Sequence, residues 1–156
     1  METSFYGPYR STNTASRWLA TGFVAGAIAV LVFHQGTLAM LHAMGVTDRA
    51  AFPMKATAPF GIPQVLSLAF WGGAWGLAMA ALMRRLDGPP LVFGSLLFGA
   101  IVPSLIAWFV VAPLKGQPGF VDLPLASILT ALAINGAWGL GTGAFLLLFG
   151  RSHVPE

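Results

Sequence analysis

Four long runs of apolar residues divide the chain, and short segments that hold most of the polar residues separate them. The runs cover about residues 18–44, 65–83, 91–112 and 123–149, and none of them contains Lys, Arg, Asp or Glu. A helix of about 20 apolar residues can cross the roughly 30 Å hydrocarbon core of a bilayer. In lipid the backbone must satisfy its own hydrogen bonds, which favours helices for runs this continuous. The pattern therefore predicts an all-α, integral membrane four-helix bundle.

The segments outside these runs are short tails and loops. We expect an N-terminal tail over residues 1–17, a transmembrane domain over 18–150 and a C-terminal tail over 151–156. The first run is longer than the apolar core of a cleaved signal peptide, which is about 7–15 residues. It is therefore predicted to stay in the protein as a span.

The composition agrees with a membrane protein and excludes several other classes. Of the 156 residues 8% are charged and 56% are hydrophobic, whereas soluble domains carry about 25% charged residues. The sequence has no Cys, which excludes a disulfide-stapled module and a Cys-ligated metal centre. The formal net charge is +3, but the cations are scattered, so we expect no nucleic-acid partner.

Lys and Arg are more numerous on one side of the predicted bundle. With four spans, both tails and the loop at 84–90 share one face, which holds Arg10, Arg17, Arg84, Arg85 and Arg151. The other face holds Arg49, Lys55 and Lys115. Cytoplasmic segments carry the excess of Lys and Arg, so we expect both termini in the cytoplasm.

Short motifs recur in the same order in the two halves of the chain. Gly-Ala-Trp-Gly-Leu occurs at 73–77 and 136–140, Pro-Met-Lys at 53–55 parallels Pro-Leu-Lys at 113–115, and Gly-Ala-Ile occurs at 26–28 and 99–101. Such self-similarity predicts an internal repeat of two tandem, parallel helical hairpins. Lys55 and Lys115 would then lie in equivalent turns on the outer face.

Small residues four positions apart are expected to hold the helices together. Such pairs let helix backbones approach closely in lipid, and they occur at Gly22 with Gly26, Gly72 with Gly76 and Gly139 with Gly143. Trp75 and Trp138 lie beside these glycines. We expect each to fill the bundle with its indole N–H bonded to a neighbouring carbonyl, and the alternative is that the two line a ligand pocket.

Three polar residues within the spans, His34, Gln35 and Asn135, form a candidate intramembrane network. A polar side chain at membrane depth is a candidate functional site. We expect hydrogen bonds between helices, from His34 or Gln35 to Asn135, Ser67 or Thr130, and a proton relay at His34 is the alternative. Haem ligation would need His on a second span, so no cofactor and no metal are predicted.

Outside the spans, Lys55 and Lys115 are candidate outer-face contacts for an anion, or else solvated loop charges. The spans hold no carboxylate and the chain shows no nucleophile motif. Without a general acid or base the sequence does not predict an enzyme.

Three segments give the chain a resemblance to a family. They are the Trp-Gly-Gly-Ala-Trp-Gly-Leu run at 71–77, the loop at 112–118 and the His-Gln-Gly break at 34–36. It resembles the uncharacterised small multi-spanning inner-membrane proteins of proteobacteria, over most of 18–150. This resemblance implies a multi-pass protein of the bacterial inner membrane and assigns no residue a role. We expect a structural or accessory subunit that associates with the lipid bilayer and with other membrane proteins or its own copies. The alternative is a small oligomeric channel or transporter with His34, Gln35 and Asn135 lining the path.

Overall fold

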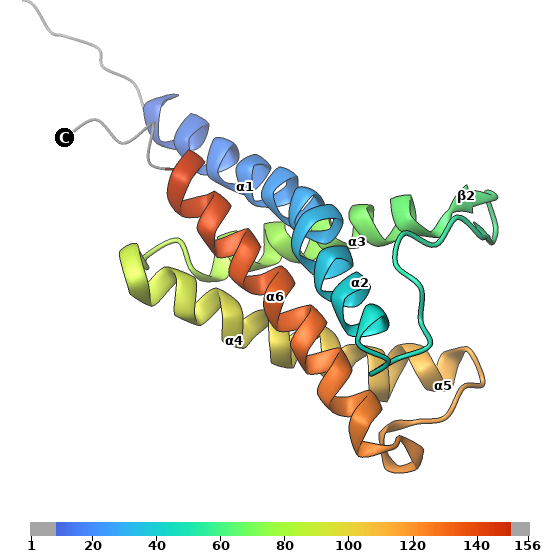
Figure 1. The fold of residues 1–156 in the computed structure, drawn as a ribbon. Helices are drawn as coiled ribbons and strands as arrows, with labels where there is room; N and C mark the ends of the chain where they lie inside the picture. Colours follow the sequence, from blue (N-terminus) through green and yellow to red (C-terminus); the bar gives the residue numbers. More distant parts are fainter. Residues whose placement is uncertain (1–8, 151–156) are drawn as a thin grey trace, which may run out of the picture.

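The structure, a computed structural model, describes residues 9–150; residues 1–8 and the predicted tail at 151–156 lie outside the described part. The described chain is mostly helical (Figure 1). Its elements are α1 (Tyr9–Ala29), the π-helix η1 (Val30–His34), α2 (Gln35–Ala43), β1 (Ala56–Thr57), β2 (Ile62–Pro63), α3 (Gln64–Leu82), α4 (Gly88–Ile106), the π-helix η2 (Ala107–Val111), α5 (Ala112–Leu114), the 3-10 helix η3 (Phe120–Asp122) and α6 (Leu125–Gly150).

Four of the helical segments are long and apolar enough to cross a membrane, as the sequence predicts: Ala15–Ala43, Gln64–Leu82, Gly88–Leu114 and Leu125–Gly150. The first comprises α1, η1 and α2 without a break, and the third comprises α4, η2 and α5. The segment at 1–17, predicted to be a tail, is helical from Tyr9 onward.

Local sequence explains where these helices begin and end. The Asp87 side chain caps α4 by accepting a hydrogen bond of 2.7 Å from the Gly88 N–H, and the prolines that follow suit the first turn because they need no N–H partner there. The first and third segments both end in a Schellman motif with Gly in the left-handed region, at Gly45 (φ +69°) and Gly116 (φ +61°). In each motif two backbone N–H groups cap the last carbonyls.

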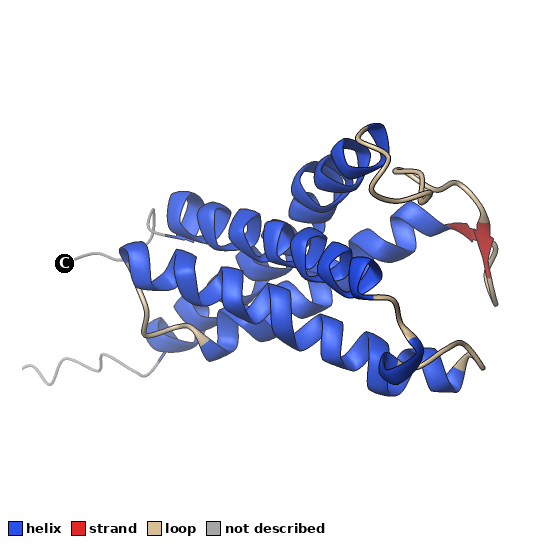
Figure 2. Ribbon diagram, turned by 60° about the horizontal axis from the view of Figure 1, so that its bottom comes forward, coloured by secondary structure: helices blue, strands red, loops and turns tan. Residues whose placement is uncertain are grey.

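The helices α1 and α6 lie side by side in the middle of the bundle, as Figures 1 and 2 show. The helix α3 packs along α1 on one flank, and α4 packs along α6 on the other flank. Between α3 and α4 themselves few positions are close. One contact between these two helices is the edge-on pair of Trp75 and Phe98, with ring centroids 6.2 Å apart.

Backbone contacts at glycine hold each flank together. A Cβ added to Gly26 of α1 would lie 2.9 Å from the Gly76 Cα of α3, and one added to Gly99 of α4 would lie 2.6 Å from the Gly139 Cα of α6. No real side chain fits at such distances. The glycine pairs therefore set how closely the two helices of each flank approach.

The connections at one end of the bundle differ in structure. Residues 44–63 carry the short antiparallel pair of β1 and β2, which projects from the helices (Figure 2). Residues 115–124 contain only η3. The tight turn between α3 and α4 lies at the opposite end of the molecule (Figure 1).

Candidate functional site

Gln35 is completely buried where the first helical segment leaves its π-helical stretch. Its Oε1 accepts a hydrogen bond of 2.6 Å from the backbone N–H of Phe52, and its Nε2 lies 3.3 Å from Nδ1 of His34. Phe52 has a φ of +53°, a conformation that non-glycine residues rarely adopt. The Gln35 amide thus holds the loop at 44–63 against the helix and helps to fix this unusual backbone.

This partner differs from the predicted one. The sequence predicts that His34 or Gln35 bonds to Asn135, Ser67 or Thr130 on another span, and Gln35 instead bonds to the loop that follows its own helix. The physical reason is that the loop folds back along α2 to its first residue and presents an N–H that would otherwise be unpaired.

Asn135 bridges two helices, as its position in the middle of a span predicts. Its Nδ2 donates a hydrogen bond of 2.9 Å to Oγ of Ser104, which joins α6 to α4. Within residues 15–150 no hydrogen bond joins Asn135 to His34 or Gln35. The structure therefore divides the three predicted polar residues into two separate sites, one at a loop anchor and one at a helix contact.

Lys55 and Lys115 are both exposed, but they do not lie in equivalent turns, which corrects the prediction from the repeated motifs. Lys55 directly precedes β1, whereas Lys115 directly follows α5 as its C-terminal cap. The connection at 44–63 is longer than the one at 115–124, so the same three-residue motif stands at different points along the two paths.

The two tryptophans of the repeated motif have different contacts. Trp138 is buried, and its indole Nε1 donates a hydrogen bond of 2.9 Å to the carbonyl oxygen of Gly26. This is the kind of bond that the sequence predicts. Trp75 is half-buried and packs edge-on against Phe98.

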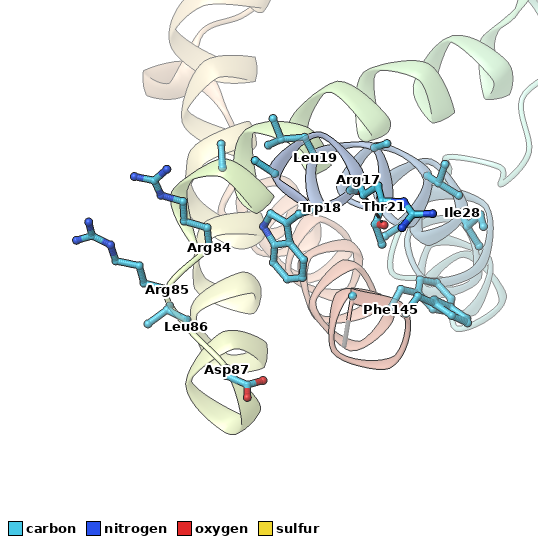
Figure 3. A pocket seen from close by; sticks show the side chains of 17 residues that line it. Arg17, Trp18, Leu19, Thr21, Ile28, Arg84, Arg85, Leu86, Asp87 and Phe145 are labelled. Carbon is cyan, nitrogen blue, oxygen red and sulfur yellow. Dashed lines mark hydrogen bonds between the residues drawn. The ribbon is translucent and has the colours of Figure 1, made fainter. Parts of the chain in front are cut away.

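An open groove, which the sequence does not predict, lies at the end of the bundle that carries the α3–α4 turn. The groove has a volume of about 1250 Å³. Its walls come from residues 15–28 of α1, from Ala81 of α3, from the turn at 84–87 and from the end of α6. Figure 3 shows Trp18 between two sets of cations, with Arg84 and Arg85 on one side and Arg17 on the other.

Trp18 is fixed in this position by two contacts. Its Nε1 donates a hydrogen bond of 2.7 Å to the carbonyl oxygen of Ala80 in α3, and its ring packs tightly against Gly150 at the end of α6. The nearness of Arg17 to Trp18 in the sequence was the available signal. Their convergence with the α3–α4 turn depends on the fold.

No family model, curated protein or solved structure matches this chain.

Proposed function

We propose that this protein is a four-span protein of a bacterial inner membrane that serves as a structural or accessory subunit of a larger membrane assembly. Its partners would be other membrane proteins or further copies of the same chain. The proposal has four parts, namely the membrane setting, the orientation, the repeat and the role, and each has its own support.

The outward-facing surface supports the membrane setting. Large apolar side chains stand exposed along the helices, among them Phe70, Trp71, Phe93 and Leu129, each more than half exposed. Soluble monomers rarely expose contiguous apolar patches larger than a few hundred Å². In a bilayer these side chains would contact lipid, and their exposure would carry no free-energy penalty.

The charges favour an orientation with both termini in the cytoplasm. Arg17, Arg84 and Arg85 lie at the end that carries the groove, whereas Arg49, Lys55 and Lys115 belong to the connections at the other end. Arg10 lies in the first turn of α1, which adds to the first end, and Arg151 is outside the described residues. Cytoplasmic segments of membrane proteins carry more Lys and Arg than the segments on the opposite side of the membrane.

Three paired features support the repeat of two tandem, parallel hairpins. In each hairpin the first span contains a π-helical stretch, and this same span ends in a Schellman motif. Each joins its two spans through glycines, Gly26 with Gly76 in the first and Gly99 with Gly139 in the second. The hairpins differ in the loops at 44–63 and 115–124.

One observation carries the proposed role: the polar side chains inside the bundle bind the helices and loops to one another. Asn135 bonds to Ser104 on another helix and Gln35 bonds to the Phe52 backbone, whereas the Thr142 hydroxyl bonds within α6, to the Trp138 carbonyl at 2.9 Å. The glycine contacts bring backbones together along the helix seams. Since the interior groups are engaged in holding the fold, the outer surface is left to interact with partners.

The test is purification of the tagged full chain in a gentle detergent, followed by mass spectrometry of the proteins that accompany it. We expect membrane proteins in fixed stoichiometry, or a defined homo-oligomer that shows no solute flux in proteoliposomes. Solute flux that Asn135→Leu or His34→Leu abolishes, in a protein that still folds, would contradict the accessory role and favour the channel or transporter.

A further inference from the structure

We propose that the groove around Trp18 binds an anionic phospholipid of the cytoplasmic leaflet. One acyl chain would lie along α1, and the phosphate would meet the arginines at the groove's mouth. This inference rests on the membrane setting proposed above.

The charges around the groove complement a phosphate. Arg17, Arg84 and Arg85 line it, their side chains are exposed, and none of them forms an ion pair with any residue from 15 to 150. Asp87 also lines the groove, where one of its carboxylate oxygens accepts the Gly88 N–H. Three guanidinium groups against one carboxylate leave the mouth positive on both sides of Trp18 (Figure 3), and a guanidinium group on either side can bind phosphate oxygens in a bidentate manner.

The depth of the groove matches one leaflet. Along α1 its lining runs from Ala15 to Ile28, and the part from Arg17 to Ile28 covers a distance of about 16 Å at about 1.5 Å of rise per residue. Half of a hydrocarbon core of roughly 30 Å is about 15 Å. A lipid with its phosphate at Arg17 would therefore end its acyl chain near Ile28.

The lining changes from polar to apolar along this length. The deeper part presents Val24 and Ile28 of α1 and Phe145 of α6, whereas Phe149 lies next to Gly150 and so nearer to Trp18. Trp18 stands at the level of the arginines (Figure 3), where tryptophan suits the boundary between headgroups and hydrocarbon. Its bond to the Ala80 carbonyl keeps the ring in place between Arg17 and the pair Arg84 and Arg85.

The experiment is native mass spectrometry of the full chain, purified in mild detergent and incubated with equal amounts of phosphatidylglycerol and phosphatidylcholine. We expect phosphatidylglycerol to remain bound at least about fivefold more than phosphatidylcholine, since one well-placed cation near a lipid surface gives roughly that factor. Equal retention of the two lipids would overturn the proposal.

Two matched variants locate the effect. The triple variant Arg17→Gln, Arg84→Gln and Arg85→Gln should abolish the preference. The variant Arg49→Gln, Lys55→Gln and Lys115→Gln removes the same charge from the opposite end and should keep it. Loss of the preference in both variants, or in the second alone, would overturn the groove as the site.

Two further variants test the groove in other ways. One keeps the positive charge so that the chain is still made in the same orientation, and the other fills the apolar lining of the groove. The triple Arg→Lys variant at 17, 84 and 85 keeps the charge that orients the chain, and it should retain part of the preference because Lys binds phosphate as a point charge. Ala81→Trp adds volume to the lining and should lower retention of both lipids. If Ala81→Trp leaves retention unchanged, the acyl chain does not lie in the groove and the proposal fails.

Other occupants give different results. If the Arg→Gln variant changes the oligomeric mass or releases a protein partner while lipid retention stays the same, the groove docks protein and the proposal is overturned. Recovery of the expressed chain outside the membrane fraction would overturn the membrane setting as well. A membrane-bound chain without lipid preference overturns the lipid site alone.

Discussion

The indole of Trp138 in α6 donates its N–H to the carbonyl oxygen of Gly26 in α1, 112 residues earlier in the chain. The same nitrogen lies where a Cβ on Gly72 would approach it at 3.3 Å, so the ring reaches the line along which α1 and α3 meet. This one side chain from the second hairpin therefore contacts both helices of the first.

Replacing Trp138 by Phe should destabilise the protein by about 1 kcal/mol, the usual contribution of one hydrogen bond. Trp75→Phe keeps an aromatic contact with Phe98, so its effect should be smaller. The measurement is unfolding by SDS from mild detergent, followed by circular dichroism. Equal losses in the two variants would show that the Trp138 hydrogen bond contributes nothing.

The glycine contacts predict a stronger effect. Gly26→Ala and Gly99→Ala should each lower the free energy of unfolding by about 1–3 kcal/mol, because the added methyl group would force two backbones apart. Gly36→Ala is the control, since a Cβ there meets nothing within 4 Å. Thermal unfolding in the same detergent compares the three, and an effect at Gly36 as large as at Gly26 would contradict the packing.

The pair Asn135 and Ser104 can be tested by a double-mutant cycle. Asn135→Ala and Ser104→Ala should each destabilise the protein, and the double variant should lose less than the sum. Hydrogen bonds of this kind between membrane helices contribute about 0.6 kcal/mol on average, which is the coupling energy we expect. Strictly additive losses would mean that the 2.9 Å hydrogen bond contributes nothing to the free energy of unfolding.

The hydrogen bond from the Phe52 N–H to Gln35 predicts how readily a protease cleaves the loop at 44–63. Gln35→Met fills a similar volume but cannot accept the Phe52 N–H, so the loop at 44–63 should be cleaved faster by a protease added to the folded protein. Gln117→Met changes an exposed side chain in the other connection and should leave the cleavage rate as it is. Hydrogen exchange at Phe52 gives an independent readout, and unchanged exchange in Gln35→Met would refute the anchor.

The apolar pattern predicts the four long helices to within a few residues, because a helix able to cross a bilayer needs about 20 apolar residues in one run. Small-residue spacing also points to the helix faces that meet, and Gly26 with Gly76 is an example. These features depend on residues close together in the sequence. They can therefore be predicted from the amino-acid sequence alone.

The hydrogen-bond partners and the groove depend on the path of the chain in space. The partner of Gln35 is a backbone N–H in a loop with no periodic pattern, and the partner of Asn135 is one serine among several in the spans. Lys55 and Lys115 look equivalent from their motifs, but the unequal connections place them differently. Arg17 comes to line the same groove as Arg84 and Arg85, on the other side of Trp18, only once α1 and α3 are packed.

The distribution of glycine contacts has a consequence for the order in which the protein assembles during synthesis. Each close contact between glycine backbones joins two spans of the same hairpin, so the first pair can dock as soon as α3 has emerged from the ribosome, whereas the contacts of Gly141 with the Phe33 ring and of Gly150 with the Trp18 ring join the hairpins. The bond from Trp138 to Gly26 must wait for α6, the last helix to be made. The chain can thus insert as two independent units, and the final helix then joins them into one body.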